Sequence, residues 1–340
     1  MLKVRYLLFC ALIVLAGTVL TGCRKGPPSQ AEFALGTVCT VNLYDQGKDE
    51  VYREIFARFR EIEGRMSVTL PGTELDRINV NAGIGPVEVH PDVFEVIELA
   101  LRYAERSGGA FDPAIGPLVS LWGIGGEEPR LPSREEIDAL LPLVNWQDVE
   151  VDREGLTVFL KRPGMALDLG AIAKGYAADE AAKILKKHRI KRAIIDLGGN
   201  ILTYGEKRDH SLWKVGIQNP LDSRGSYIGI MEIRDQTVVT SGVYERFFEA
   251  AGERYHHILS PADGYPARNG LLSVTIVTRR SADADALSTA VFVLGYEKGK
   301  ALVESLERVG AVFIFEDRSI RLCGGAGFIL TDESYRIVSD

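Results

Sequence analysis

Cysteine and histidine are scarce in this chain, and neither occurs at a spacing typical of a zinc site. The 340 residues include four cysteines and five histidines, and no two cysteines form a CxxC pair. After position 23 only Cys39 and Cys323 remain, and two distant cysteines are weak evidence for a disulfide even in an oxidising compartment. We therefore expect buried free thiols and no structural zinc.

Several common catalytic signatures and a basic surface are also missing. The sequence has no GxGxxG, no GxxxxGK[ST] and no GxSxG, so a Rossmann-type site, a P-loop and a hydrolase nucleophile elbow lack support. Two of the 40 basic residues and none of the 47 acidic residues precede Cys23, which leaves a net charge near −9 from there onward. Such a surface argues against nucleic acid as a partner.

The N-terminus has the pattern of a secretory signal. Lys3 and Arg5 precede an apolar run, 6–20, which is short for a membrane span but suits a signal-peptide core. The run ends in Leu-Thr-Gly-Cys23, which is similar to the lipobox of bacterial lipoproteins, where the cysteine is lipidated. We expect a signal peptide at 1–22, lipidation at Cys23 and a tether at 23–31; an uncleaved membrane anchor is the alternative.

The remaining residues, 32–340, have a mixed pattern of strands and helices without an internal repeat. Alternating residues predict a strand at 33–44, and short strand-like segments include 165–168, 193–197 and 271–278. Helical spacing covers 49–66, 91–107, 171–188, the segment after 281 and a further helix to 308, whereas 108–126 looks like a glycine-rich connection. Because strands and helices do not alternate steadily, we predict an α+β fold with a mixed sheet flanked by helices in one compact unit.

The segment 282–293 places oxygen ligands at the start of an apolar helix. Asp285, Ser288 and Thr289 are three and four residues apart, so they share one helical face. Such hard oxygen ligands suit Mg²⁺, which keeps part of its ligand shell for water and substrate phosphate. The simpler interpretation is an acidic N-cap, formed by Asp283 or Asp285.

A second segment, 168–175, runs from a predicted strand into a helix. Gly170 lets the backbone turn, and the free N–H groups of the helix N-terminus favour an anion. Lys174 lies at the unfavourable end of the helix dipole, which indicates an anionic partner, although a solvated surface lysine is equally consistent.

Three further segments carry weaker signals. Paired glycines in 196–200 (DLGGN) indicate close backbone approach or only a tight turn. His256 and His257 precede another turn, and each could be a general base or a satisfied structural residue. The loop 115–125, with Trp122, could line the pocket of a planar ligand or belong to the core.

Taken in order, these segments resemble the ApbE family of FAD:protein FMN transferases. The matching segments are 35–37 (LGT), 66–67 (MS), 74–79 (ELDRIN), 109–122 (GAFDPAIGPLVSLW), 167–179 (LDLGAIAKGYAAD), 196–200 (DLGGN), 213–217 (WKVGI), 240–242 (TSG), 257–261 (HILSP), Gly264 and 285–289 (DALST). The resemblance implies transfer of FMN from FAD to a threonine or serine hydroxyl of a target protein, with release of AMP. It also implies an acceptor in a membrane redox complex, on the extracytoplasmic side of a bacterial membrane.

The resemblance assigns roles to individual residues. It implies Mg²⁺ held by the Ala171 carbonyl, Asp285 and Thr289, with Ser288 as an occasional contributor. His257 lies where the family has a histidine thought to activate the acceptor hydroxyl, and Lys174 supplies positive charge. Flavin and phosphate contacts are implied for Leu35, Thr69, Ala110, Phe111, Asp112, Asp168, Lys174 and Ile258.

The sequence departs from the family pattern at two positions. Thr69 stands where many members have an aromatic residue that could stack on a flavin or adenine ring, and Ser260 stands where an aspartate is common. Without that ring, water could compete with the protein hydroxyl, so hydrolysis of FAD to FMN and AMP is an expected side activity. The alternatives are an FAD pyrophosphatase and a lipoprotein that stores or delivers FAD without catalysis.

Overall fold

The structure is a computed structural model that describes residues 29–45, 49–223 and 225–339. The predicted signal peptide, Cys23 and the tether up to residue 28 lie outside the described residues. The last three residues of the predicted tether, 29–31, belong to the first strand. No helix in the described ranges is both long and apolar enough to span a bilayer.

A nine-stranded sheet forms the centre of the described chain. In spatial order its strands are β1 (Ser29–Ala34), β2 (Thr37–Leu43), β6 (Ala193–Leu197), β7 (Asn200–Tyr204), β10 (Thr237–Gly242), β13 (Leu271–Thr278), β14 (Gly310–Phe315), β15 (Ser319–Cys323) and β17 (Arg336–Ile337). Its neighbouring strands pair antiparallel, except that β15 and β17 are parallel. The predicted α+β fold with a mixed sheet core is confirmed.

Both faces of the large sheet are covered. A smaller sheet, made of β8 (Trp213–Gln218), β9 (Tyr227–Ile233) and β16 (Phe328–Leu330), packs its apolar residues against one face. Helices pack against the other face and form the main hydrophobic core there. All eight residues of β13 are therefore buried, as expected for a strand with no solvent-facing side.

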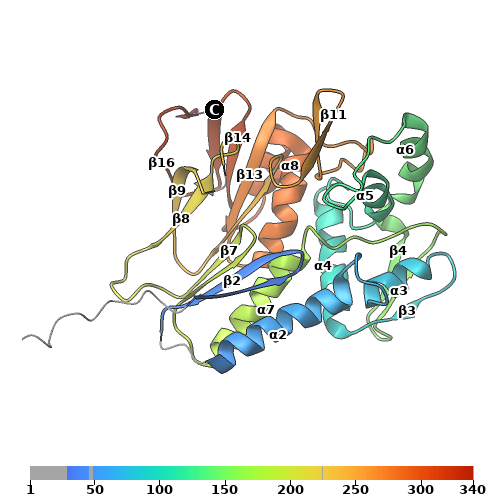
Figure 1. The fold of residues 1–340 in the computed structure, drawn as a ribbon, viewed down its shortest axis with the longest axis horizontal. Coiled ribbons are helices and arrows are strands. Elements are labelled where there is room, and N and C mark those ends of the chain that lie inside the picture. Colours follow the sequence, from blue (N-terminus) through green and yellow to red (C-terminus); the bar gives the residue numbers. More distant parts are fainter. Residues whose placement is uncertain (1–28, 46–48, 224, 340) are drawn as a thin grey trace, which may run out of the picture.

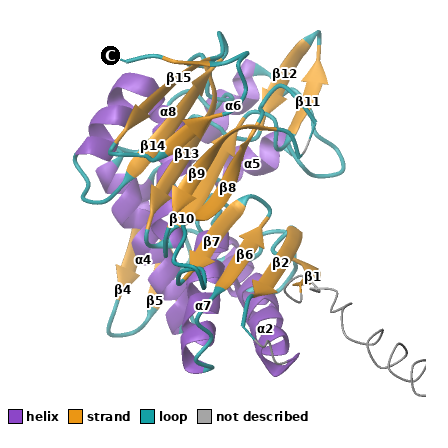
Figure 2. Cartoon of the chain, turned by 90° about the vertical axis from the view of Figure 1, so that its left-hand side faces the viewer, coloured by secondary structure: helices purple, strands orange, loops and turns teal. Residues whose placement is uncertain are grey.

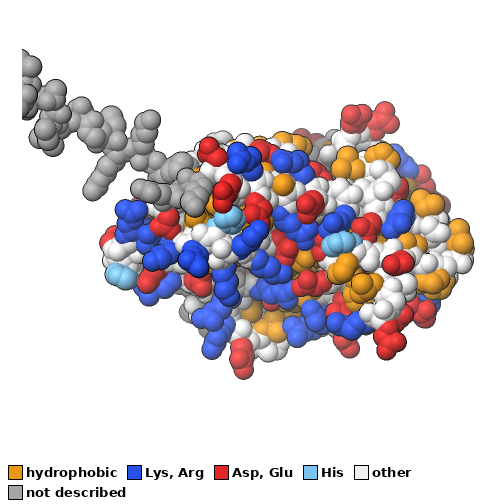
Figure 3. Space-filling view, turned by 90° about the horizontal axis from the view of Figure 1, so that it is seen from below, with side chains coloured by type: hydrophobic (Ala, Val, Ile, Leu, Met, Phe, Trp, Pro, Cys, Tyr) orange, Lys and Arg blue, Asp and Glu red, His pale blue; other side chains and the backbone are white. Residues whose placement is uncertain are grey.

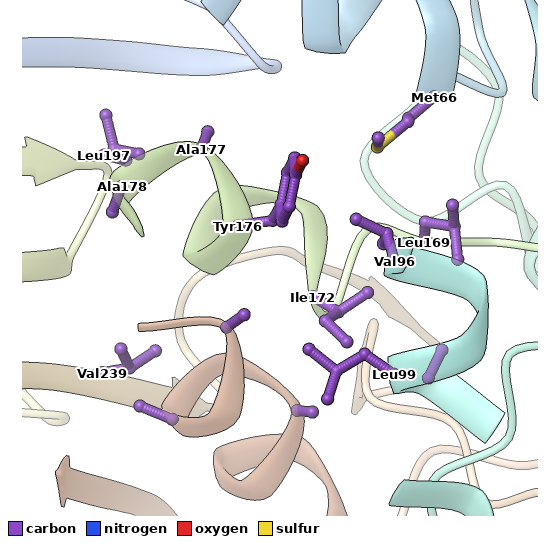
Figure 4. Packing of buried hydrophobic residues seen from close by; sticks show 14 of the residues in the cluster. Met66, Val96, Leu99, Leu169, Ile172, Tyr176, Ala177, Ala178, Leu197 and Val239 are labelled. Carbon is purple, nitrogen blue, oxygen red and sulfur yellow. The ribbon is translucent and has the colours of Figure 1, made fainter. Parts of the chain in front are cut away.

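The helices are arranged in two groups, which Figures 1 and 2 show from two directions. Within the described residues they are α2 (Asp49–Met66), α3 (Glu74–Val80), α4 (Pro91–Arg106), α5 (Gly116–Trp122), α6 (Arg134–Leu140), α7 (Ala173–Lys187) and α8 (Ser281–Glu304). Helices α2, α7 and α8 lie along the large sheet, and Figure 4 shows Leu169 and Ile172, just before α7, pointing toward α4. The two helices predicted after 281 are both in α8, which is broken at Gly295, where φ is 74°.

The second group lies at the end of the molecule opposite β8 and β9 (Figure 1). It contains α3–α6, the short 3-10 turns Leu141–Leu143 and Trp146–Asp148, and a sheet of β3 (Val87–Glu88), β5 (Thr157–Leu160) and β4 (Val149–Asp152). Helix α5 lies inside the segment predicted to be a connection, with Pro117 in its first turn and Gly123 at its left-handed end. Trp122 is fully buried and donates to the Gly264 carbonyl at 2.8 Å, so it belongs to the core.

Two sequence predictions differ from the structure in detail. The single strand predicted at 33–44 is the hairpin β1–β2, because Leu35 and Gly36 both adopt positive φ and reverse the chain. The predicted strand at 165–168 is an extended segment with one isolated bridge, from Ala166 to Ile115. The amide of Asn79, on α3, satisfies the backbone of Leu167 instead of a neighbouring strand.

Helices α7 and α8 cross closely near their N-termini and satisfy each other's free N–H groups. Asp179 of α7 accepts from the backbone N–H groups of Ser281 and Ala282, at 2.8 and 3.0 Å. In return, Asp285 of α8 accepts from the Gly175 N–H of α7 at 2.9 Å. Neither Asp283 nor Asp285 caps its own helix, so the N-cap interpretation does not hold.

The surface carries charges of both signs. Figure 3, which views the molecule from the side of α2, shows Lys and Arg interspersed with Asp and Glu on that face. Ion pairs join α2 to α7, with Arg58 2.9 Å from Glu180 and Lys187 2.7 Å from Glu54. The cysteines Cys39 and Cys323 are buried and form no disulfide with each other, as predicted, and burial raises the pKa of Cys39 to about 12.

The close crossing predicts that Gly175→Ala destabilises the protein. An added Cβ would lie 2.3 Å from the Ser281 carbonyl oxygen, which is backbone and cannot rotate away. We expect the free energy of unfolding in urea to fall by about 2–4 kcal/mol. Gly64→Ala is the matched control, because its Cβ meets nothing within 4 Å in α2, and it should stabilise by about 0.5–1 kcal/mol. Equal effects of the two substitutions would contradict this account of the crossing.

Candidate functional site

A cavity of about 540 Å³ opens between the large sheet and the second group of helices. Its wall is built from the β1–β2 turn, the end of α2, the loop before α5, the segment leading into α7, the end of β10 with the residues after it, the segment 257–261 and the start of α8. The predicted site residues in its wall are Leu35, Thr69, Ala110, Phe111, Asp112, Asp168, Ala171, Lys174, His257, Ile258, Asp285 and Thr289. Ser288 does not line the cavity, and Cys23 lies outside the described residues.

The two carboxylate oxygens of Asp285 make different contacts. Its Oδ2 accepts from the Gly175 N–H, and its Oδ1 lies 3.8 Å from the ammonium of Lys174. Lys174 also donates to the Gly170 carbonyl at 2.8 Å, which keeps the cation over the first turn of α7. Because Asp285 is only 4% exposed, its position is fixed by the helix crossing rather than by solvent.

A chain of hydroxyl groups supports Asp285 and orients Thr289. Ser288 is fully buried and donates to the Asp285 backbone carbonyl at 2.9 Å. Since Ser288 has only one proton, Ser241 must donate to it across 2.8 Å, and Thr289 in turn donates to Ser241 across 3.2 Å. The Thr289 oxygen keeps its lone pairs for the cavity, and Ser288 acts as a support instead of a wall residue.

These oxygen groups suit a small hard cation. In the described part of the chain, no three His, Cys, Asp or Glu side chains cluster as metal ligands. Mg²⁺ does not need such a cluster, because it is commonly held by one or two carboxylates together with substrate phosphate and water. Asp285 Oδ1, the Thr289 hydroxyl and the Ala171 carbonyl, all in the cavity wall, are chemically appropriate ligands.

The two neighbouring histidines have different roles. His256 is 5% exposed, its Nε2 donates to the Ala267 carbonyl at 3.0 Å, and its Nδ1 accepts from the Ile258 N–H at 3.3 Å. Both nitrogens are satisfied, so His256 is structural, and burial lowers its pKa to about 4. His257 lines the cavity instead.

The hydrogen bonds of His257 fix its tautomer. Its Nδ1 lies 3.2 Å from the Arg246 carbonyl, which can only accept, so Nδ1 carries the proton and Nε2 has a free lone pair. Burial, followed by the charges of Arg246, His256 and Lys174, lowers the His257 pKa to about 3. His257 is therefore a neutral acceptor at physiological pH.

Two aspartates in the cavity wall accept hydrogen bonds from backbone N–H groups. Asp168 accepts from the Gly170 N–H at 2.7 Å, and burial raises its pKa, an effect opposed by that hydrogen bond and by Lys174 and Arg246. Asp112 accepts from the backbone N–H groups of Ala114 and Trp146, and burial raises its pKa to about 6. Both carboxylates thus organise loops at the cavity.

Sequence reasoning missed Arg246 and Glu63, which also line the cavity, and it noted Asn200 and Ser241 only within the segments 196–200 and 240–242. Arg246 Nη2 lies 3.4 Å from the Gly36 carbonyl, and Glu63 accepts from the Gly36 N–H at 3.3 Å. These charged side chains hold the β1–β2 turn from two sides. No spacing in the sequence could place them there, because they come from separate elements.

One cavity thus brings the cations Lys174 and Arg246 together with oxygen groups that are chemically suited to a hard cation. The chain belongs to the ApbE family, whose model matches residues 35–313. It is 41% identical over 315 residues to the FAD:protein FMN transferase of Treponema pallidum, covering 87% of both chains. It is 38% identical over 312 residues to that of Klebsiella pneumoniae, covering 91% of this chain and 96% of the other.

Solved structures show the same likeness. The ApbE protein of Thermotoga maritima has a TM-score of 0.78 at 32% identity, and the two structures overlap over 91% of this chain and 97% of the other. The flavin transferase ApbE of Vibrio cholerae has a TM-score of 0.76 at 29% identity, with the same coverage. The predicted family membership is confirmed.

The electrostatics of the cavity predict that Arg246→Gln raises the pKa of His257. Removing a nearby positive charge makes the imidazolium less unfavourable, while the backbone carbonyl that binds Nδ1 is retained. An NMR titration of the His257 ring protons should show the pKa moving from about 3 toward 6.5. Arg254→Gln on β12 (Glu253–His256) is the control and should leave the His257 pKa unchanged. A fall in pKa on removing Arg246 would refute the assignment.

Proposed function

We propose that this chain transfers FMN from FAD to a threonine or serine hydroxyl of a target protein. The acceptor oxygen bonds to the FMN phosphorus, the phosphoanhydride bond breaks, and AMP leaves with the bridging oxygen. The single observation that carries the proposal is that one cavity brings together Lys174, Asp285, Thr289 and His257, a cation-binding and phosphate-binding set beside a base. The names of the relatives support the same activity.

His257 is proposed to receive the proton of the acceptor hydroxyl at Nε2. The Arg246 carbonyl holds the ring through Nδ1, so the lone pair of Nε2 is presented in a fixed direction. In the protein alone His257 is a weak base, because burial, followed by the nearby positive charges, lowers its pKa to about 3. The negative diphosphate of FAD would offset those charges and strengthen the base when the substrate is present.

Lys174, together with a metal held by the oxygen ligands, is proposed to neutralise the negative charge of the diphosphate. The Lys174 ammonium, in the first turn of α7, would supply the positive charge for the anion, because the N–H groups of Ala173 and Gly175 in that turn already have acceptors in the protein. Asp285, Thr289 and the Ala171 carbonyl would hold Mg²⁺. The bound metal would neutralise charge that develops on non-bridging phosphate oxygens. Positioning and charge neutralisation together account for most of what phosphoryl-type transfer requires.

Dependence on the metal site is tested by Asp285→Asn. The amide oxygen can still accept from the Gly175 N–H, so the fold should persist, but the negative charge for the cation is lost. With FAD, Mg²⁺ and an acceptor domain, we expect covalent fluorescence on gels and AMP release each to fall at least about 100-fold.

The control for that experiment is Asp283→Asn, on the same helix but outside the cavity wall, which should keep full activity. Full labelling by Asp285→Asn would remove the proposed metal site. If the unmodified protein binds FAD but gives neither labelled acceptor nor AMP, the storage alternative is supported instead.

FAD hydrolysis is proposed as a side activity because of Thr69. This residue lies in the cavity wall just after α2, where its hydroxyl is 3.0 Å from that of Ser67. A short polar side chain leaves bound flavin uncovered on that side, so water could reach the phosphorus in place of the acceptor hydroxyl.

A ring at position 69 should suppress that hydrolysis. Without acceptor protein, Thr69→Tyr is expected to lower the rate of AMP release several-fold, while labelling of an added acceptor is largely retained. Leu70→Tyr, in the same loop but outside the cavity wall, is the control. An unchanged rate of AMP release in Thr69→Tyr would show that this position does not control access of water.

The location and the partner are proposed from the sequence. The lipobox-like segment before Cys23 supports a lipid-anchored protein outside the cytoplasm, and the family resemblance supports an acceptor in a membrane redox complex. A lipid anchor would hold the cavity near such an acceptor and raise its effective concentration.

A further inference from the structure

Asn200 has a buried hydrogen-bond donor that no described residue satisfies. It is the first residue of β7, lies in the cavity wall and is 2% exposed. Its amide nitrogen, Nδ2, has no hydrogen-bond partner among residues 29–45, 49–223 and 225–339. Because an unsatisfied buried donor costs free energy, such a group in a ligand cavity points to a ligand that completes it.

The orientation of the amide follows from its neighbours. Ser281 donates to Asn200 Oδ1 across 2.7 Å. Thr237 Oγ1 lies 3.1 Å both from the Ser281 hydroxyl and from the Ile201 carbonyl, so its single proton is shared between them. The amide oxygen therefore accepts a hydrogen bond, whereas the amide nitrogen on the other side of the planar group has no acceptor among the described residues. The missing partner must be an acceptor, since Nδ2 can only donate.

The turn that carries Asn200 is tightly constrained. Gly198 and Gly199 both have positive φ and join β6 to β7 as a two-residue turn. A Cβ on Gly198 would lie 2.2 Å from the Thr37 hydroxyl, so this turn packs directly against β2. The DLGGN segment thus holds the Asn200 amide in place.

Two sets of contacts connect Asn200 to the residues of the proposed phosphate site. Ser281, which binds its amide oxygen, and Asp285 are four residues apart on α8 and so lie one turn apart on the same side. Asn200 is also paired with Val239, and Ser241, two residues further along β10, projects on the same face and contacts Thr289.

We propose that Asn200 Nδ2 donates a hydrogen bond to a phosphate oxygen of the diphosphate of the bound flavin nucleotide. This inference rests on the proposed function and adds a binding residue from the DLGGN segment. The donor is neutral and the acceptor charged, so its loss should weaken binding about tenfold.

Binding of three ligands tests the inference without requiring transfer. Asn200→Asp keeps the shape and an oxygen for Ser281 but replaces the donor with an acceptor. By calorimetry with Mg²⁺, we expect the Kd for FAD and for ADP to rise at least about tenfold, and that for riboflavin, which has no phosphate, to stay within about twofold.

Ser281→Ala is the matched control, because it removes the hydrogen bond to Asn200 Oδ1 and leaves the donor in place. A second variant, Asn200→Ala, removes the whole amide, and Ser281→Ala should lower the Tm as much as that variant does. The Kd of Ser281→Ala for ADP should rise by less than the Kd of Asn200→Asp or of Asn200→Ala. Unchanged ADP binding by Asn200→Asp would overturn the inference, as would a parallel loss of riboflavin or an equal loss in Ser281→Ala. If the unmodified protein binds no FAD, the proposed function itself fails.

Discussion

The site depends on the crossing of α7 and α8, where each helix satisfies the N-terminus of the other. Asp179 accepts from the first N–H groups of α8, and Asp285 accepts from an N–H group of α7. The contact needs glycine at position 175, because the Ser281 carbonyl leaves no space for a side chain. The same interaction that joins the helices therefore places Asp285 beside Lys174 at the cavity.

Charged side chains of both signs meet at this cavity. Lys174 and Arg246 bring positive charge to a cavity wall that also contains Asp168 and Asp285. In the protein alone burial, together with the two cations, keeps His257 neutral by lowering its pKa, and its Nδ1 is bound to the Arg246 carbonyl. In the proposed reaction, a phosphate-bearing ligand and a hard cation would balance both sets of charges.

The sequence predicted much of the fold for identifiable reasons, and most of the predicted site residues line the cavity. Helical periodicity located α2, α4 and α7, and alternation located β2, because one face of these elements is buried. The strand-like segment 271–278 is β13, which is buried on both faces. The segment 165–168 misled this reasoning because Asn79 replaces its strand partner. Arg246 carries no local signal, because its role arises only where it meets the β1–β2 turn and His257. The DLGGN segment indicated a close backbone approach but not the role of the Asn200 side chain, which arises where β7 meets α8. Ser288 has the spacing of a ligand but is turned into the core to support Asp285.

The most direct test of the account is a crystal structure with FAD and Mn²⁺ in place of Mg²⁺, using anomalous scattering to locate the metal. The account predicts one strong anomalous peak between the FAD diphosphate and Asp285, within coordination distance of Thr289. FAD bound in the cavity without a peak there, or with the metal held elsewhere, would contradict it.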